Sequence, residues 1–165
     1  TPLKPNITFI KIGGNDTQPD PEISTLEFRS NMTLLVSKLR AIESKVCLMT
    51  YHSPISNLYG EERVRKLSRF MEIIREVANA EGTYLIDDLP MWEILREKHP
   101  SIHQSLIQDE IHLNKLGNIF LGLSLIKKLN LDISERDQTY WAEAIRIYNL
   151  IHGDKINASE SSYRA

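Results

Sequence analysis

Residues 7–16 read Ile7-Thr8-Phe9-Ile10-Lys11-Ile12-Gly13-Gly14-Asn15-Asp16. The first six residues are mostly apolar and β-branched, which predicts a β-strand that ends at the glycine pair. Glycines at this point let the backbone turn sharply and come close to a ligand. Asn15 would present a neutral amide N–H2 there, and such a donor can stabilise the oxyanion of an acyl-transfer intermediate. An Asn-Asp turn without any chemistry also fits these residues.

Helices and strands alternate after this first strand. Apolar residues recur at steps of three and four and predict helices over 28–42 and 64–78, the second ending at Gly82. Short apolar runs predict strands at 46–50 and 83–86. Connections of helix length between strands predict parallel pairing and an α/β layered fold. Because ligands bind outside the carboxyl ends of parallel strands, we expect functional residues in the segments 13–17, 51–56 and 87–90.

The carboxyl-terminal half is expected to be helical. Residues 91–108 have a mixed pattern broken by Pro100, which predicts short helices and loops. Asn114 is expected to cap a helix whose apolar stripe runs to Ile126, and a last helix is expected around 140–148. The residues after His152 are polar. We therefore expect one domain over 1–151 and a polar tail over 152–165.

A second chemical motif, Asp109-Glu110-Ile111-His112, lies just before the helix that Asn114 is expected to cap. This step can place the aspartate within hydrogen-bond reach, about 3.2 Å, of His112 Nδ1. The aspartate would then fix the tautomer of the imidazole and leave Nε2 free as a general base. A surface Asp–His pair without a role is the alternative. A metal site is disfavoured, because no second His or Cys stands nearby.

Taken together, the two motifs resemble the SGNH (GDSL) ester hydrolase family. That family keeps Gly-x-Asn-Asp after a central strand and Asp-x-x-His shortly before a closing helix, and the similarity covers roughly residues 5–130. The resemblance implies a three-layer flavodoxin-like fold with a parallel sheet. It also implies that His112 is the general base and Asp109 its orienting acid. In the loop it implies an oxyanion donor at Asn15, shaping glycines at Gly13 and Gly14, and a bracing carboxylate at Asp16.

The family's nucleophilic serine lies in a Gly-Asp-Ser block that this sequence does not contain. The resemblance implies that two strands and this block precede Ile7. We expect them to come from upstream sequence of the same domain or from a complementing chain that pairs beside residues 7–12. Ser53 is a weaker candidate for the nucleophile. His52 beside it is a candidate residue of the substrate cleft.

Two other functions remain open at this stage. The chain could be a non-catalytic binding or structural module on a degenerate SGNH fold. A flavodoxin-like phosphate-binding module would need a glycine-rich loop leading into a helix, but Gly13-Gly14 is followed by Asn-Asp. For the hydrolase, we expect an acetyl or short acyl ester of a carbohydrate or lipid as the substrate.

Composition narrows the remaining classes. The 165 residues carry 20 Lys and Arg against 22 Asp and Glu, a net charge of -2, which gives no reason to expect nucleic acid as a partner. A single cysteine, Cys47, rules out an internal disulfide, and we expect no cofactor or metal. No apolar run approaches the length of a membrane span. The composition is that of a soluble protein, and both a cytoplasmic location and secretion through an upstream signal fit it.

Overall fold

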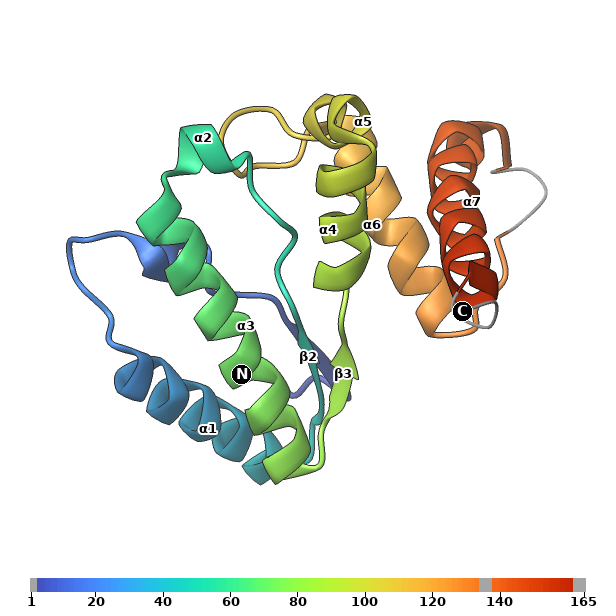
Figure 1. The fold of residues 1–165 in the computed structure, drawn as a ribbon. Coiled ribbons are helices and arrows are strands. Elements are labelled where there is room, and N and C mark those ends of the chain that lie inside the picture. Colours follow the sequence, from blue (N-terminus) through green and yellow to red (C-terminus); the bar gives the residue numbers. More distant parts are fainter. Residues whose placement is uncertain (1–2, 134–137, 162–165) are drawn as a thin grey trace. The chain divides into compact units, whose positions relative to one another are not determined.

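The computed structural model describes residues 3–133 and 138–161 (Figure 1). The chain divides into two compact units, Thr1–Leu89 and Pro90–Ala165. The first unit contains a parallel sheet with helices, and the second is helical. The expected domain boundary at residue 151 stays a prediction.

The first unit is an α/β structure. Its three strands lie in the order β1-β2-β3, and both pairings are parallel. This confirms the α/β fold with a parallel sheet that the sequence predicted. Along the chain its elements are β1 (Ile7–Ile10), the 3-10 helix η1 (Asn15–Thr17), α1 (Thr25–Ala41), β2 (Lys45–Met49), α2 (Ser56–Tyr59), α3 (Glu61–Glu81) and β3 (Tyr84–Ile86).

The central strand β2 organises the core of this unit. Its last four residues are buried, including Cys47. Helices α1 and α3 lie side by side and pack against the sheet (Figure 1). Phe28 of α1 stacks on Phe70 of α3 with ring centroids 4.0 Å apart. The apolar stripes that predicted these helices are therefore the surfaces that bury each other and the sheet.

Capping residues set the ends of these helices. The side chain of Ser24 accepts a hydrogen bond from the backbone N–H of Glu27 and starts α1. Gly82 adopts the left-handed conformation, with φ of 57°, and ends α3 as predicted. The predicted strand over residues 7–12 is shorter than expected. Its pairing with β2 stops at Ile10, before the turn at Gly13, where φ is 119°.

The described residues of the second unit form four helices around an apolar cluster. The ring of Trp92 meets Phe120 edge-on, with centroids 5.4 Å apart. The helices are α4 (Leu89–Lys98, which starts at the last residue of the first unit), α5 (Pro100–Ser105), α6 (Lys115–Lys128) and α7 (Gln138–Ser161). The buried cluster comprises Met91, Trp92, Leu95, Leu106, Phe120, Leu123, Ala144, Ile147 and Ile151.

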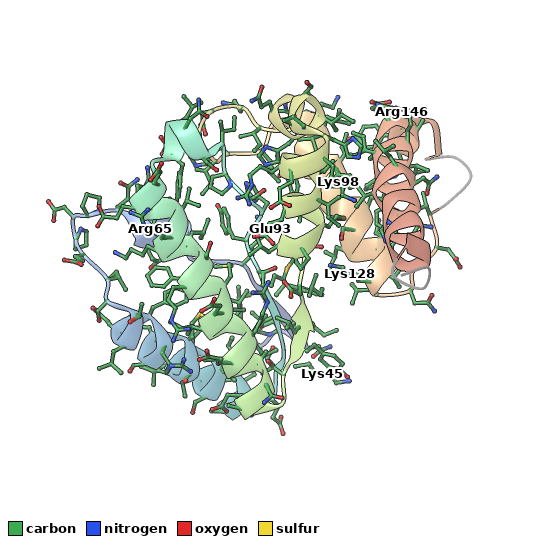
Figure 2. The ribbon with its side chains drawn as sticks, in the orientation of Figure 1. Lys45, Arg65, Glu93, Lys98, Lys128 and Arg146 are labelled. Atoms are coloured by element: carbon green, nitrogen blue, oxygen red, sulfur yellow. The ribbon has the colours of Figure 1, made fainter. Side chains whose placement is uncertain are left out.

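Helices of both units carry exposed charged side chains. Arg65 of α3, Lys98 of α4 and Arg146 of α7 are all exposed (Figure 2). Arg146 forms a two-pronged ion pair with Glu143, one helical turn earlier, and this pair raises the pKa of Arg146. Within the described residues, no helix combines the length and the apolar character needed to cross a membrane.

The last helix is longer than its apolar residues predicted. Helix α7 continues past His152 to Ser161, within the segment expected as a polar tail, and that tail as a separate part of the chain stays a prediction. No proline interrupts residues 138–161, which lets the helical hydrogen bonds continue through the polar sequence. The rest of the expected tail, residues 162–165, lies outside the described residues.

We predict that Gly117→Ala destabilises the protein, although glycine to alanine within a helix usually stabilises by about 1 kcal/mol. A Cβ at Gly117 would lie 2.1 Å from the backbone oxygen of Leu106, so the backbone would have to shift. Such overpacking should lower the free energy of unfolding by about 1–3 kcal/mol, as measured by chemical denaturation.

Gly122→Ala is the matched control for this substitution in the same helix. There the nearest atom to an added Cβ is a ring carbon of Trp141 at 3.4 Å, which is an ordinary contact. We expect Gly122→Ala to keep or raise the free energy of unfolding. Equal effects of the two substitutions would contradict the close contact at Gly117.

Candidate active site

The loop after β1 has a fixed, tightly packed backbone. Gly13 is buried with φ of 119°, and an added Cβ would lie 2.9 Å from Cε of Met71. The backbone conformation therefore favours glycine there, whereas the end of the Met71 side chain could shift to admit a Cβ. Gly14 is buried as well and precedes η1, in which Asn15 is exposed and Asp16 is half-buried. The predicted oxyanion donor thus stands at the start of a short helix with its side chain open to solvent.

Two buried hydroxyls hold the Gly14 carbonyl of this loop. Thr17 Oγ1 lies 2.7 Å and Tyr59 Oη 2.8 Å from this oxygen, and the two hydroxyl oxygens share a hydrogen bond of 2.5 Å. Tyr59 could not be predicted from the sequence, because it lies 45 residues from Gly14 and no local pattern links the two. Thr17 is within the segment expected to be functional, but its own role was not predicted.

His52 and Ser53 follow β2 in the same unit. Both are buried, with exposed fractions of 2% and 1%. Nδ1 of His52 lies 3.1 Å from Nζ of Lys11, and its ring stacks on Tyr51. Burial lowers the pKa of Lys11 to about 8, opposed by the attraction of Asp88. The roles assigned to His52 and Ser53 stay predictions.

Asp109 and His112 are brought together in the second unit. Oδ2 of Asp109 lies 2.8 Å from Nδ1 of His112, which confirms the predicted hydrogen bond. Oδ1 of Asp109 accepts from the backbone N–H groups of Ile111 and His112, at 2.9 Å and 2.8 Å. The aspartate therefore closes a four-residue turn with one oxygen and orients the imidazole with the other. The His112 side chain is 66% exposed, so it is open to a reaction partner.

The turn is attached on both sides to neighbouring helices. Ile107 and Leu113 form an antiparallel bridge across its base. Asn114 caps α6 as predicted, because its Oδ1 accepts from Gly117 N–H at 3.0 Å, and its Nδ2 donates to the carbonyl of Ser105 at 2.7 Å. These bonds fix the position of the Asp109–His112 pair relative to α5 and α6.

The hydrogen bonds also determine the charge of Asp109. The backbone N–H of Ile111, then the backbone N–H and the ring of His112, lower the pKa of Asp109 to about 2. The carboxylate is therefore ionised at neutral pH and accepts the Nδ1 proton of His112. That tautomer leaves Nε2 as the basic nitrogen, which is the state a general base requires.

The loop of residues 13–16 belongs to the first unit, and the Asp109–His112 pair belongs to the second. Each set is ordered within its own unit, and the joint catalytic roles stay predictions. In the part of the chain that the structure describes, no group of three or more His, Cys, Asp or Glu side chains is arranged to hold a metal ion.

The sequence profile of the GDSL-like lipase/acylhydrolase family matches residues 1–118, a range that includes both motifs. The chain belongs to this family. No curated protein matches it in sequence.

Solved structures of esterases share the fold. A catalytic mutant of Axe2, an acetylxylan esterase from Geobacillus stearothermophilus, matches with a TM-score of 0.65 and 17% identity over 78% of this chain. A lipase/acylhydrolase from Enterococcus faecalis matches with a TM-score of 0.63 and 22% identity over 76% of this chain. The chain spans only 61% and 62% of the length of these two proteins. Separate catalytic mutants of Axe2 carry alanine in place of a serine, an aspartate and a histidine three residues after that aspartate.

We predict that the Asp109 carboxyl titrates with a midpoint of about 2, measured by carbon NMR over the pH range in which the chain stays folded. Its pKa is lower in the folded chain than the value of about 3.9 expected when unfolded. The associated stabilisation is therefore complete above pH 4 and is lost as the pH falls through about 2.

His112→Ala tests the cause of this shift, because the variant keeps both backbone N–H donors. We expect the midpoint to rise when the ring is removed, but to stay below about 3.9. A normal midpoint in the unaltered chain would contradict the geometry of the turn.

Proposed function

We propose that this chain forms part of an ester hydrolase that acts by Ser–His–Asp acyl transfer, with the serine on sequence outside these 165 residues. The observation that carries the proposal is the 2.8 Å hydrogen bond between Asp109 and Nδ1 of His112. Surface pairs of this kind also occur without function. This chain, however, belongs to a family of lipases and acylhydrolases. The three-residue separation of Asp109 and His112 also equals that of the aspartate and histidine replaced in the Axe2 mutants.

In the proposed reaction, Nε2 of His112 takes the proton of the serine hydroxyl as its oxygen attacks the ester carbonyl. Asp109 stays ionised and stabilises the imidazolium that forms. Asn15 donates to the negatively charged oxygen of the tetrahedral intermediate. His112 then gives the proton to the departing alcohol, and water releases the acyl group by the same sequence of transfers.

The exposed side chains of β1 support the proposal that the serine lies on sequence outside these 165 residues. β1 is an edge strand, and its residues Ile7 and Phe9 are 53% and 43% exposed. Parallel sheets are normally covered on both faces, and the free N–H and C=O groups of an edge strand can pair with another strand. We propose that a further segment, from the same domain or from a complementing chain, pairs beside β1 and carries the nucleophile. Ser53 is a weaker candidate, because it is 1% exposed and a nucleophile must be reached by its substrate.

We propose an acetyl or short acyl ester as the substrate. Some of the solved structures similar to this chain are described as acetylxylan esterases, and another is described as a lipase/acylhydrolase. Esters of carbohydrates and esters of lipids should therefore both be tested.

We predict that the 165-residue chain alone does not hydrolyse a short-chain nitrophenyl ester, because its sequence contains no Gly-Asp-Ser block to supply the nucleophile. The same chain with its natural upstream sequence should hydrolyse it, and His112→Ala should abolish that activity. Release of nitrophenolate is the measurement.

Two outcomes would overturn this assignment. Activity of the chain alone that disappears in Ser53→Ala would make Ser53 the nucleophile. Inactivity of the extended chain on acetyl, short acyl and lipid esters would favour the alternative, a non-catalytic module on the same fold.

We predict that Asn15→Ala lowers kcat of the ester-hydrolysing form by about 10²–10³, as loss of one oxyanion donor does in other enzymes. KM should change much less, because the donor acts on charge that develops in the transition state. Asn79→Ala is the matched control, since Asn79 is an exposed asparagine near the end of α3. An Asn15→Ala variant with the kcat of this control would show that Asn15 is only a turn residue.

A further inference from the structure

The hydroxyl of Tyr59 is buried against the loop that carries Asn15. Tyr59 is the last residue of α2 and is 1% exposed. Its Oη lies 2.8 Å from the Gly14 carbonyl oxygen, and Thr17 Oγ1 lies 2.7 Å from the same oxygen. The two hydroxyl oxygens are 2.5 Å apart, so one hydroxyl donates to the other while the second donates to the carbonyl. The carbonyl oxygen is thus held in a network of two hydroxyls, and neither side chain is accessible to solvent.

We propose that Tyr59 is a positioning residue for the oxyanion donor Asn15, an inference that rests on the proposed function. The carbonyl that Tyr59 holds belongs to the peptide group between Gly14 and Asn15. Because a peptide group is planar, fixing its oxygen also fixes the direction of the Asn15 N–H and the start of η1. The hydrogen bonds of Tyr59 and Thr17 therefore orient the backbone from which the Asn15 side chain extends.

The glycine pair makes such an anchor necessary. Gly13 and Gly14 have no side chains of their own to restrict rotation, and Gly13 already has φ of 119°. Without the two hydroxyls, the Gly14 carbonyl oxygen would keep only the long hydrogen bond from the backbone N–H of Thr17, at 3.4 Å, among its hydrogen bonds within this loop. An oxyanion donor is effective only when it is oriented before charge develops, because reorientation during the reaction costs energy.

Arg63 of α3 completes the anchor on the outer side. Its guanidinium lies 3.8 Å from the centroid of the Tyr59 ring. Its Nε lies 3.4 Å from Thr17 Oγ1, and its Nη1 lies 3.5 Å from the Tyr59 carbonyl oxygen. These contacts connect η1, α2 and α3, so the loop is held by three separate parts of the first unit. The ring of Tyr59 is fixed by packing, and its hydroxyl is the part that acts on the loop.

Tyr59→Phe tests the inference in the ester-hydrolysing form, because it keeps the ring and the contact with Arg63 and removes only the hydroxyl. We expect kcat to fall about 10-fold, since small displacements of catalytic groups have effects of this order. KM and the thermal unfolding midpoint should change little by comparison. Tyr84→Phe removes a hydroxyl from a residue that is 69% exposed and should leave kcat unchanged.

A double-mutant cycle separates positioning from a general structural role. If Tyr59 acts through Asn15, then Tyr59→Phe should reduce kcat by less than about 2-fold once Asn15→Ala is present. An undiminished 10-fold loss in that background would overturn the inference. If Asn15→Ala lowers kcat but Tyr59→Phe does not, only this inference fails. If Asn15→Ala has no effect, the oxyanion assignment of the proposed function fails first.

Thr17→Val provides the same test if Tyr59→Phe does not fold. It removes the second hydroxyl at the Gly14 carbonyl with little change in side-chain shape. We expect the same loss of kcat, the same small change in KM and the same dependence on Asn15. A folded Thr17→Val variant with full kcat would overturn the proposed anchor.

Discussion

Parallel strand pairing brings the loops of the first unit to one place. Strands that run in the same direction have their carboxyl ends at one edge of the sheet. The segments that follow β1, β2 and β3 are accordingly joined by contacts between side chains and backbone. Thr50 Oγ1 accepts from the N–H groups of Asp88 and Leu89, at 2.8 Å and 3.0 Å, and Lys11 lies beside His52. Any change in the pairing of β2 would separate these loops.

The two halves of the proposed site are stabilised in different ways. Asp109 and His112 need only a short turn, because one carboxylate binds the N–H groups of the turn and the imidazole together. The loop at Gly14 depends on Tyr59, which lies on another helix, and on Arg63 behind it. The pair should therefore keep its geometry wherever α5 and α6 are folded. The loop should lose its geometry when the packing of the first unit is disturbed.

The sequence was informative where local rules decide structure. Apolar periodicity predicted α1 and α3, and the capping roles of Gly82 and Asn114 were read correctly. The same rules missed α2, because a single turn has too few residues for a period to be seen. They also ended the last helix too early, because its polar residues gave no apolar stripe. Neither error affected the fold class, which follows from the order of the long elements.

The sequence by itself determined the Asp109–His112 hydrogen bond, since three residues of separation leave few conformations that a short turn can adopt. It also placed Asn15 in the loop that follows β1. Only the tertiary structure decided that Tyr59 and Thr17 share the Gly14 carbonyl, because 45 residues separate Tyr59 from Gly14 and packing alone brings them together. The requirement for glycine at position 117 has the same origin: the backbone oxygen of Leu106 occupies the space that a side chain would need.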